Sequence, residues 1–346
     1  MNSFYPLKVS QIRVLTANAV ELKFKIPDEL ESKFNFMAGQ YITIKQQING
    51  EEARRAYSIC STNTEGVAIG VKKLEGGKMS TFLTADVKLG DTLEVMPPAG
   101  NFVLQGKNIV GICAGSGITP ILSMIKTILL NSDNSKFTLI YGNKTQDSTM
   151  FTDQLKELQV TNPDRLKIHW AFSRERIAGA INGRLDKNNI QQLLNTFSYL
   201  KSADEYFVCG PGDLIDNANE LLLLNKVNQK NIHFERFTVV KNEDKTNNNT
   251  DEIIANVMVS IDGEDFEFTL SNKGQTILDA TMEQGADVPF SCKGGVCCTC
   301  KAKVMEGKAI MDQNFSLSEE EVEEGFILTC QSHPITENIV VDFDEM

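Results

Sequence analysis

The sequence Cys292-Lys-Gly-Gly-Val-Cys297-Cys-Thr-Cys300, with Cys330 arriving from a later segment, is the most informative stretch of this chain. Three cysteines in one tight loop and a fourth from elsewhere is the ligand spacing of a plant-type [2Fe–2S] cluster. The two glycines between Cys292 and Cys297 keep side chains away from the inorganic sulfides and let backbone N–H groups turn inward. The alternatives are a disulfide pair or a zinc site, but zinc sites usually show two separate Cys/His pairs. We predict that these four cysteines hold a [2Fe–2S] cluster.

Length and composition predict a multidomain protein of the cytoplasm. The 346 residues suffice for two or three domains, and 41% of them are hydrophobic. The polar N-terminal sequence does not resemble a signal peptide. The most apolar stretch, Ile109–Leu122, is interrupted by glycines, which argues against a membrane span. The eight cysteines are therefore expected to be cytosolic thiols and ligands.

The negative charge is concentrated at the C-terminal end of the chain. The net charge is −12, and after residue 251 there are 19 acidic residues and only 5 lysines. This acidity favours solubility, or electrostatic steering toward a basic partner surface, and the sequence leaves both open. Such a balance argues against nucleic-acid binding, and with no predicted membrane span we expect no membrane partner.

Residues 1–104 have the pattern of a small antiparallel β-barrel. Leu22–Ile26 and Tyr41–Ile44 are short runs of strand-forming residues. Many short strands separated by turns are typical of a barrel. Turn dipeptides are expected at Asn49-Gly50, Gly76-Gly77 and Pro97-Pro98.

Residues 105–240 change to alternating strands and helices, which predicts a parallel α/β domain. The expected strands are Asn108–Cys113, Phe137–Tyr141, Lys167–Phe172 and Glu205–Cys209. The next segment, 241–251, has almost no apolar residue and is predicted to be a solvated linker.

Residues 252–346 form the last predicted unit. Asp262-Gly263 between two alternating runs predicts a hairpin. A helix is expected over Thr276–Gln284, and Ser318 with Glu321 forms the capping-box pattern of a short acidic helix.

Two motifs in the first segment suit a flavin nucleotide. In Arg55-Ala56-Tyr57-Ser58 the guanidinium can neutralise a phosphate, the ring can stack on a flat cofactor, and the hydroxyl can bond a ring nitrogen. In Gly77-Lys78-Met79-Ser80-Thr81 glycine precedes a helix start, which suits a pyrophosphate. The alternative is an ordinary surface arginine, a core tyrosine and a loop with a capping serine.

Three motifs in the second segment suit a pyridine dinucleotide. The turn of Gly115, Gly117, Ile118, Thr119 and Pro120 follows a strand and lets the backbone approach a pyrophosphate. Cys209-Gly210-Pro211 ends another strand, where ligands bind in such sheets, although Cys209 is equally a small core residue. Ser173-Arg174 can hold a 2′-phosphate, which favours NADPH over NADH, or form a plain surface loop.

In their order along the chain these motifs resemble the ferredoxin–NADP reductase family with a plant-type ferredoxin domain fused at the C-terminus. The resemblance covers essentially the whole chain outside the linker. It implies an α+β multidomain fold with a flavin barrel, a nucleotide-binding α/β domain and a β-grasp [2Fe–2S] domain. Ile48–Glu52 and the sequence around Cys330 further resemble reductases of phenylacetyl-CoA epoxidases.

The resemblance also implies roles for residues. Tyr57 and Ser58 face the isoalloxazine, Arg55 and Lys78–Thr81 hold phosphates, and Cys209 lies near the nicotinamide. Ser58 and Cys209 are therefore the candidate catalytic residues, and Phe237 is a candidate flavin cover or a core residue.

The implied electron path runs from NADPH to FAD, to the [2Fe–2S] cluster and to a di-iron oxygenase partner. Reductases of similar layout use FMN and NADH, so those cofactors remain alternatives. Two other functions remain open: the reductase component of a steroid or aromatic-ring oxygenase, and a redox-sensing protein.

Overall fold

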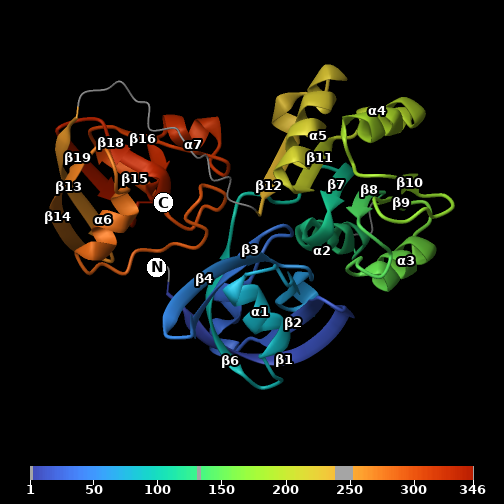
Figure 1. Ribbon diagram of the computed structural model, residues 1–346, viewed down its shortest axis with the longest axis horizontal. Coiled ribbons are helices and arrows are strands. Elements are labelled where there is room, and N and C mark those ends of the chain that lie inside the picture. Colours follow the sequence, from blue (N-terminus) through green and yellow to red (C-terminus); the bar gives the residue numbers. More distant parts are fainter. Residues whose placement is uncertain (1–2, 131–133, 238–251, 346) are drawn as a thin grey trace. The chain divides into compact units, whose positions relative to one another are not determined.

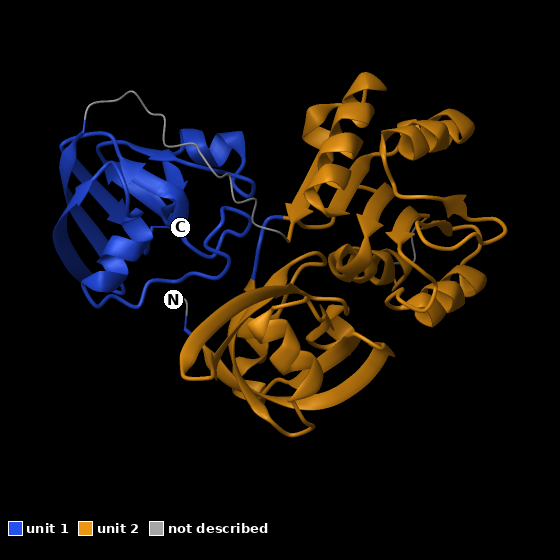
Figure 2. Cartoon of the chain, viewed as in Figure 1, with its two compact units in different colours: residues 1–3, 99–101, 238–346 blue, residues 4–98, 102–237 orange. Residues whose placement is uncertain are grey.

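The computed structural model describes residues 3–130, 134–237 and 252–345. The predicted linker, 241–251, lies outside the described residues. The chain divides into two compact units (Figure 2), one made of residues 4–98 and 102–237 and the other of residues 1–3, 99–101 and 238–346.

The first unit begins with a six-stranded antiparallel sheet in the order β4-β3-β6-β1-β2-β5 (Figure 1). A bridge between Ile59 and Ile69 joins the two ends of this order and closes the sheet on itself. Helix α1 (Lys78–Ala85) inserts Met79 and Leu83 into the core that the sheet encloses. The strands are β1 (Tyr5–Thr16), β2 (Ala19–Lys25), β3 (Tyr41–Ile48), β4 (Glu51–Ser58), β5 (Ala68–Lys72) and β6 (Thr92–Ala99).

The structure confirms the predicted turn at Asn49-Gly50 and contradicts the one at Pro97-Pro98. Asn49 and Gly50 have φ values of +53° and +81° and join β3 to β4 as predicted. The turn expected at Pro97-Pro98 is wrong, because both prolines lie within β6. The ladder between β6 and β1 runs only from Thr92 to Val95. The prolines lie beyond it, where the missing N–H removes no bond to β1.

The rest of the first unit is a parallel α/β sheet in the order β10-β9-β8-β7-β11-β12. Because the chain adds strands on one side of β7 and then crosses to β11 on the other, the topological switch lies between β7 and β11. Ligands bind at such a point in open α/β sheets. The elements are β7 (Asn108–Ala114), α2 (Ile118–Leu130), β8 (Lys136–Asn143), α3 (Thr152–Thr161), β9 (Leu166–Phe172), β10 (Ile181–Asn182), α4 (Lys187–Thr196), β11 (Glu205–Gly210), α5 (Gly212–Leu224) and β12 (Ile232–Arg236).

Helices cover both faces of this sheet because its strands alternate between two apolar sets. Phe207 and Cys209 pack with α2 and α3, whereas Tyr206 and Val208 pack with α4 and α5. The cluster around α2 also includes barrel residues such as Cys60, so the barrel and this face of the sheet share one core, while the barrel interior and the opposite face each have their own. Helices α2 and α5 have 13 residues each, and no helix in the described part is long and apolar enough to cross a membrane.

The second unit holds a mixed five-stranded sheet, β14-β13-β19-β15-β17, with α6 packed on its core. Asp262 and Gly263 have φ values of +51° and +77° and form the predicted hairpin. The predicted capping box at Ser318 and Glu321 is confirmed. The elements are β13 (Ile254–Ile261), β14 (Glu264–Ser271), α6 (Ile277–Glu283), β15 (Lys301–Glu306), β16 (Ala309–Met311), α7 (Glu319–Glu323), β17 (Phe326–Leu328), η6 (Thr329–Gln331), β18 (Ser332–Pro334) and β19 (Asn338–Asp342).

Candidate functional site

The four candidate cluster cysteines come together in the second unit. Cys292, Cys297 and Cys300 lie in the loop between α6 and β15, and Cys330 lies in η6. The sulfur atoms of Cys297 and Cys292 are 3.2 Å apart, and the Cys330 thiol is hydrogen-bonded with those of Cys292 and Cys300. The backbone N–H of Gly294 donates to the Cys292 sulfur at 3.3 Å. Four converging sulfurs are the donor set of a [2Fe–2S] cluster.

The crowding of these sulfurs changes the pKa values of Cys292, Cys297 and Cys330. Hydrogen bonds with Cys297 and Cys330 lower the pKa of the Cys292 thiol, and the same bonds raise the pKa of Cys297 and Cys330. If all four thiols ionise at such short separations, a cation must compensate their negative charges. Among the described residues, no three His, Cys, Asp or Glu surround one metal-ion position. Two irons with two thiolates each would use all four sulfurs of this arrangement.

The first flavin motif lies at the end of β4, where Ser58 pairs with Tyr41 of β3. The Arg55 side chain is exposed, and its guanidinium donates to the Arg54 carbonyl at 2.7 Å. Tyr57 is half-buried, and burial raises the pKa of its phenol, so the ring stays neutral. An exposed guanidinium two residues from a neutral ring suits a phosphate attached to a flat heterocycle.

The second flavin motif is the start of α1. Gly76 has a φ of +72°, and Gly77 caps the helix without any side-chain hydrogen bond. The first amides of α1 can therefore receive an anion. The following side chains have protein partners: Lys78 pairs with Glu51, Met79 packs in the barrel core, and the Ser80 hydroxyl bonds the loop backbone. The Thr81 amide already donates to the Gly77 carbonyl at 3.1 Å, so the backbone N–H groups nearer the start of α1 are the better phosphate donors.

The turn after β7 presents backbone groups in the same way. Gly115 has a φ of +57°, and its carbonyl accepts from the Tyr141 hydroxyl at 2.9 Å. Ile118, Thr119 and Pro120 are all buried, so their side chains do not line an open surface. A nucleotide at this turn would therefore contact its main chain.

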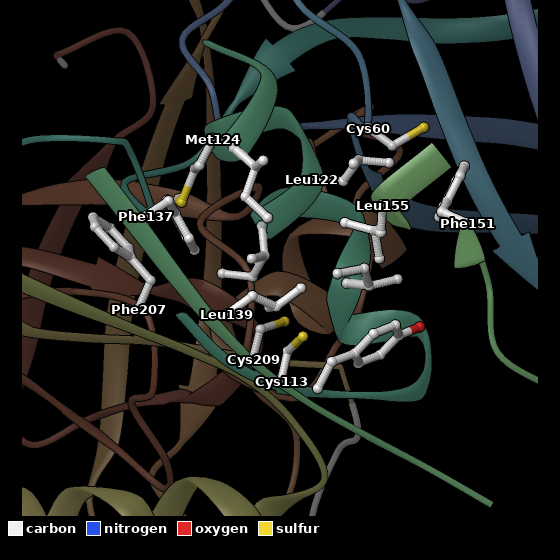
Figure 3. Packing of buried hydrophobic residues seen from close by; sticks show 14 of the residues in the cluster. Cys60, Cys113, Leu122, Met124, Phe137, Leu139, Phe151, Leu155, Phe207 and Cys209 are labelled. Atoms are coloured by element: carbon white, nitrogen blue, oxygen red, sulfur yellow. The ribbon is translucent and has the colours of Figure 1, made fainter. Parts of the chain in front are cut away.

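Gly117 and Cys209 meet at the topological switch. A Cβ on Gly117 would lie 2.2 Å from the Cys209 carbonyl oxygen, so only glycine fits there. Cys209 is directly opposite Cys113 in the ladder between β11 and β7, and Figure 3 shows the two thiols side by side. Both are fully buried, and burial raises the pKa of each thiol. Cys209 is thus held neutral beside the Gly210-Pro211 turn into α5.

Ser173 and Arg174 are exposed immediately after β9. Their amides donate to the carbonyls of Asn143 and Lys144, which fixes this loop against the end of β8. Lys72 of β5, a lysine whose amine is close to Lys144, was not identified from the sequence. Lys72 of β5 donates to the Ser148 carbonyl at 3.3 Å, and burial and the Lys144 charge lower the pKa of its amine.

Glu235 is the acidic residue that sequence reasoning overlooked. It lies in β12 opposite Cys209, and the Ser58 hydroxyl donates to its Oε2 at 3.2 Å. Burial raises the pKa of the Glu235 carboxyl to about 8, although the Ser58 hydrogen bond opposes this rise. Because β12 also carries the polar residues His233 and Arg236, its sequence offers no signal that singles out Glu235. Phe237, just beyond the strand, is 41% exposed.

Comparison with known proteins assigns each region. Residues 6–104 match the oxidoreductase FAD-binding domain, residues 112–220 the oxidoreductase NAD-binding domain, and residues 259–334 the 2Fe-2S iron-sulfur cluster binding domain. These matches support the cofactor classes inferred from the three groups of motifs.

Two full-length relatives and one solved structure are similar over nearly the whole chain. One subunit of the 1,2-phenylacetyl-CoA epoxidase from Escherichia coli K12 is 40% identical over 99% of both chains. The ferredoxin reductase component of 3-ketosteroid-9-alpha-monooxygenase from Rhodococcus rhodochrous is 32% identical over 97% of this chain and 96% of its own. The structure of phthalate dioxygenase reductase is 26% identical, with a TM-score of 0.60 and 98% coverage of each chain.

The predicted fold class is confirmed, with an antiparallel flavin barrel, a parallel α/β domain and a C-terminal ferredoxin domain. The chain also has the FAD-binding, NAD-binding and 2Fe-2S domains in the order of its relatives. It therefore belongs to the ferredoxin–NADP reductase-like oxidoreductases with a fused [2Fe–2S] domain, the family of oxygenase reductase components.

Proposed function

We propose that this chain is the reductase component of a phenylacetyl-CoA epoxidase, which takes electrons from NADPH and delivers them to a di-iron oxygenase. The identity of 40% across 99% of both chains with the Escherichia coli protein carries this proposal. When bound, the nicotinamide supplies a hydride, and the flavin and the iron–sulfur cluster convert that electron pair into single-electron steps.

The division of labour follows the predicted boundaries. Residues 1–104 bind the flavin, residues 105–240 bind the nucleotide, and residues 252–346 bind the cluster, joined by segment 241–251. The regions that match the three family models lie inside these limits.

In the flavin site, Arg55 and the start of α1 hold phosphate groups, Tyr57 and Ser58 face the isoalloxazine, and Phe237 covers it. The exposed guanidinium and the uncapped helix start support this assignment. FAD is the proposed flavin, since residues 6–104 match an FAD-binding model.

In the nucleotide site, the turn from Gly115 to Pro120 and the Gly210-Pro211 turn hold the dinucleotide at the switch between β7 and β11. Ser173 and Arg174 bind its 2′-phosphate, and Cys209 lies beside its nicotinamide. The exposure of Ser173 and Arg174 at the carboxyl edge of the sheet supports the preference for NADPH.

Glu235 and Ser58 keep a proton beside the place where hydride transfer occurs. Because the pKa of Glu235 is about 8, this carboxyl is neutral at pH 7 and adds no negative charge next to an electron-rich ring. Ser58, fixed by its bond to Glu235, keeps its oxygen as an acceptor for a cofactor N–H.

The partner docks near the ferredoxin domain through its negative charge. The 19 acidic residues after position 251, against 5 lysines, support attraction to a basic surface on the oxygenase. Salt weakens such steering, so oxygenase reduction is expected to slow as ionic strength rises.

Anaerobic titration of the purified chain with NADPH and with NADH, followed by visible spectroscopy, tests the electron path. We expect NADPH to bleach both the flavin and the cluster bands. Loss of the 2′-phosphate contact in Arg174→Gln is expected to raise KM for NADPH about tenfold to a hundredfold and to leave KM for NADH unchanged. The matched control is Arg176→Gln, an exposed arginine two residues away.

A wild-type preference for NADH would remove the role of Arg174 but keep the reductase. Cluster bands that stay oxidised while the flavin bleaches would contradict the electron path.

The 32% identity with the ketosteroid monooxygenase reductase favours one second candidate, a steroid oxygenase as the acceptor. Reconstitution with each oxygenase separates the two. Turnover of phenylacetyl-CoA supports the proposal, and turnover confined to a 3-ketosteroid overturns it.

A further inference from the structure

Gln331 directly follows Cys330 and reaches back to the cluster loop. Its Nε2 atom lies 3.2 Å from the Lys293 carbonyl oxygen, 2.8 Å from the Cys330 carbonyl oxygen and 3.8 Å from the Cys330 sulfur. Lys293 lies between the first two cysteines of the loop, 38 positions away in the chain. One amide therefore connects the segment that carries three cysteines to the segment that carries the fourth.

The loop that Gln331 contacts has an unfavourable backbone. Lys293 has a φ of +49°, in the left-handed region that is unfavourable for a residue with a Cβ. Gly295 has a φ of +68°, and a Cβ there would lie 2.8 Å from the Gln313 carbonyl oxygen and 3.3 Å from the Gln331 Cγ. Such conformations persist only where neighbouring groups hold them. Gln331 does so at the Lys293 carbonyl, and Asp279 holds the Lys293 amine at 2.7 Å.

The contact with the Cys330 sulfur has an electronic consequence. The cluster gains one negative charge when it accepts an electron. A hydrogen bond to a ligand sulfur stabilises the more negative form, and such bonds are among the factors that set cluster potentials. A donor at this sulfur therefore favours the reduced cluster.

We propose that Gln331 is a positioning residue that fastens the cluster loop to the fourth-ligand segment and raises the reduction potential of the cluster. The inference rests on the four-cysteine ligand set of the proposed function.

The test compares two substitutions of similar length. Gln331→Met removes the N–H donors, and Gln331→Lys keeps donors at the same reach and adds a positive charge. We expect the Met variant to shift the ratio of reduced to oxidised cluster about tenfold toward the oxidised form, equivalent to about 59 mV for one electron. The Lys variant is expected to match or exceed the wild-type potential. Spectroelectrochemical titration of the full chain gives these values without turnover.

The control is Gln275→Met, which removes an amide of the same domain that donates to Glu283 and is expected to leave the potential unchanged. If the Met and Lys variants shift equally, or the Met variant keeps the wild-type potential, the proposal is overturned. If the Met variant purifies without a cluster, the Lys variant decides: a retained cluster at or above the wild-type potential supports the role, and a lower potential or a lost cluster overturns it.

Failure of the ligand set is distinguishable from failure of this inference. A wild-type chain without cluster absorption bands would remove the ligand assignment itself. A loaded wild type with an unchanged potential in Gln331→Met removes only the role of Gln331.

Discussion

Glu235 and Ser58 are 177 positions apart and meet through a single hydrogen bond. Ser58 was predicted from its local motif, since an arginine, a tyrosine and a serine on one strand end are visible in the sequence. Glu235 could not be found that way, because its neighbours in space arise only when β12 pairs with β11. The cluster cysteines, in contrast, could be predicted from local sequence, because three of the four lie at the ligand spacing within one loop.

Replacing Glu235 with glutamine tests the proton that the structure assigns to it. The folded chain holds this proton up to about pH 8, whereas the unfolded chain releases it near 4.5. Wild-type stability therefore falls as pH rises between these values and then levels off. The free energy of unfolding of Glu235→Gln does not fall in this way. Its excess over the wild-type value is therefore expected to grow from near zero at about pH 4 to roughly 2–4 kcal/mol at about pH 8.5.

Urea denaturation followed through Trp170, the single tryptophan, measures this difference. Glu220→Gln, at an exposed carboxylate of α5, is the control and is expected to show a small, pH-independent change. A pH-independent difference for Glu235→Gln would contradict the raised pKa.

At the scale of elements, the turn between β7 and α2 was predicted as a phosphate-binding loop. The structure adds a packing reason that no local pattern contains, since Gly117 touches the backbone of Cys209 on the neighbouring strand. Sequence periodicity indicates that strands and helices alternate, but not which strands become neighbours.

We expect Gly117→Ala to push β7 and β11 apart at the switch and to destabilise the unit by more than about 2 kcal/mol. The control is Gly90→Ala, where φ is +91° but no atom lies within 4 Å of the added Cβ. That change is expected to cost only about 1 kcal/mol of backbone strain. Equal losses in the two variants, measured by urea denaturation, would refute the steric argument.

Helix α2 is attached to the barrel by an ion pair between the buried Lys126 and the exposed Glu65. Lys126, only 7% exposed, lies 3.1 Å from the Glu65 carboxylate, and the Ser123 hydroxyl donates to the Ser61 carbonyl at 2.6 Å. Glu65→Gln leaves a buried cation without a counter-charge and is expected to cost about 1–3 kcal/mol. Lys126→Met leaves only the more exposed carboxylate and is expected to cost less.

Trp170 fluorescence during urea denaturation again provides the measurement. The exposed pair of Lys187 and Glu220 supplies the control Lys187→Met, with an expected change within about 0.5 kcal/mol. A larger loss for Lys126→Met than for Glu65→Gln would invalidate this account.

For the whole molecule, the three cofactor regions and the fold class followed from motifs that each fit in a short stretch of chain. The closure of the barrel through Ile59 and Ile69 and the core shared by the barrel and α2 did not. They depend on contacts between distant segments whose residues are merely apolar, and apolar character does not specify a partner.

Removing one cluster ligand is expected to cut the electron path at one point. Cys297→Ser should abolish reduction of one-electron acceptors that draw on the cluster and leave reduction of the flavin by NADPH intact. Stopped-flow absorbance measures the flavin step, and cytochrome c reduction measures the later one. Cys298→Ser is the control, since this neighbouring thiol donates to the Ser316 carbonyl at 3.3 Å. Loss of flavin reduction in a folded, flavin-loaded Cys297→Ser would contradict the division of labour.

The buried thiols also decide how the molecule can be labelled. Cys60, Cys113 and Cys209 are fully buried, and burial raises the pKa of each, so none offers the exposed thiolate that a maleimide dye attacks. A maleimide dye is therefore not expected to label the flavin- and nucleotide-binding unit. A cysteine introduced at an exposed position such as Lys187 would be the reactive thiol of that unit, and its dye would report on the distance to the cluster-bearing unit during turnover.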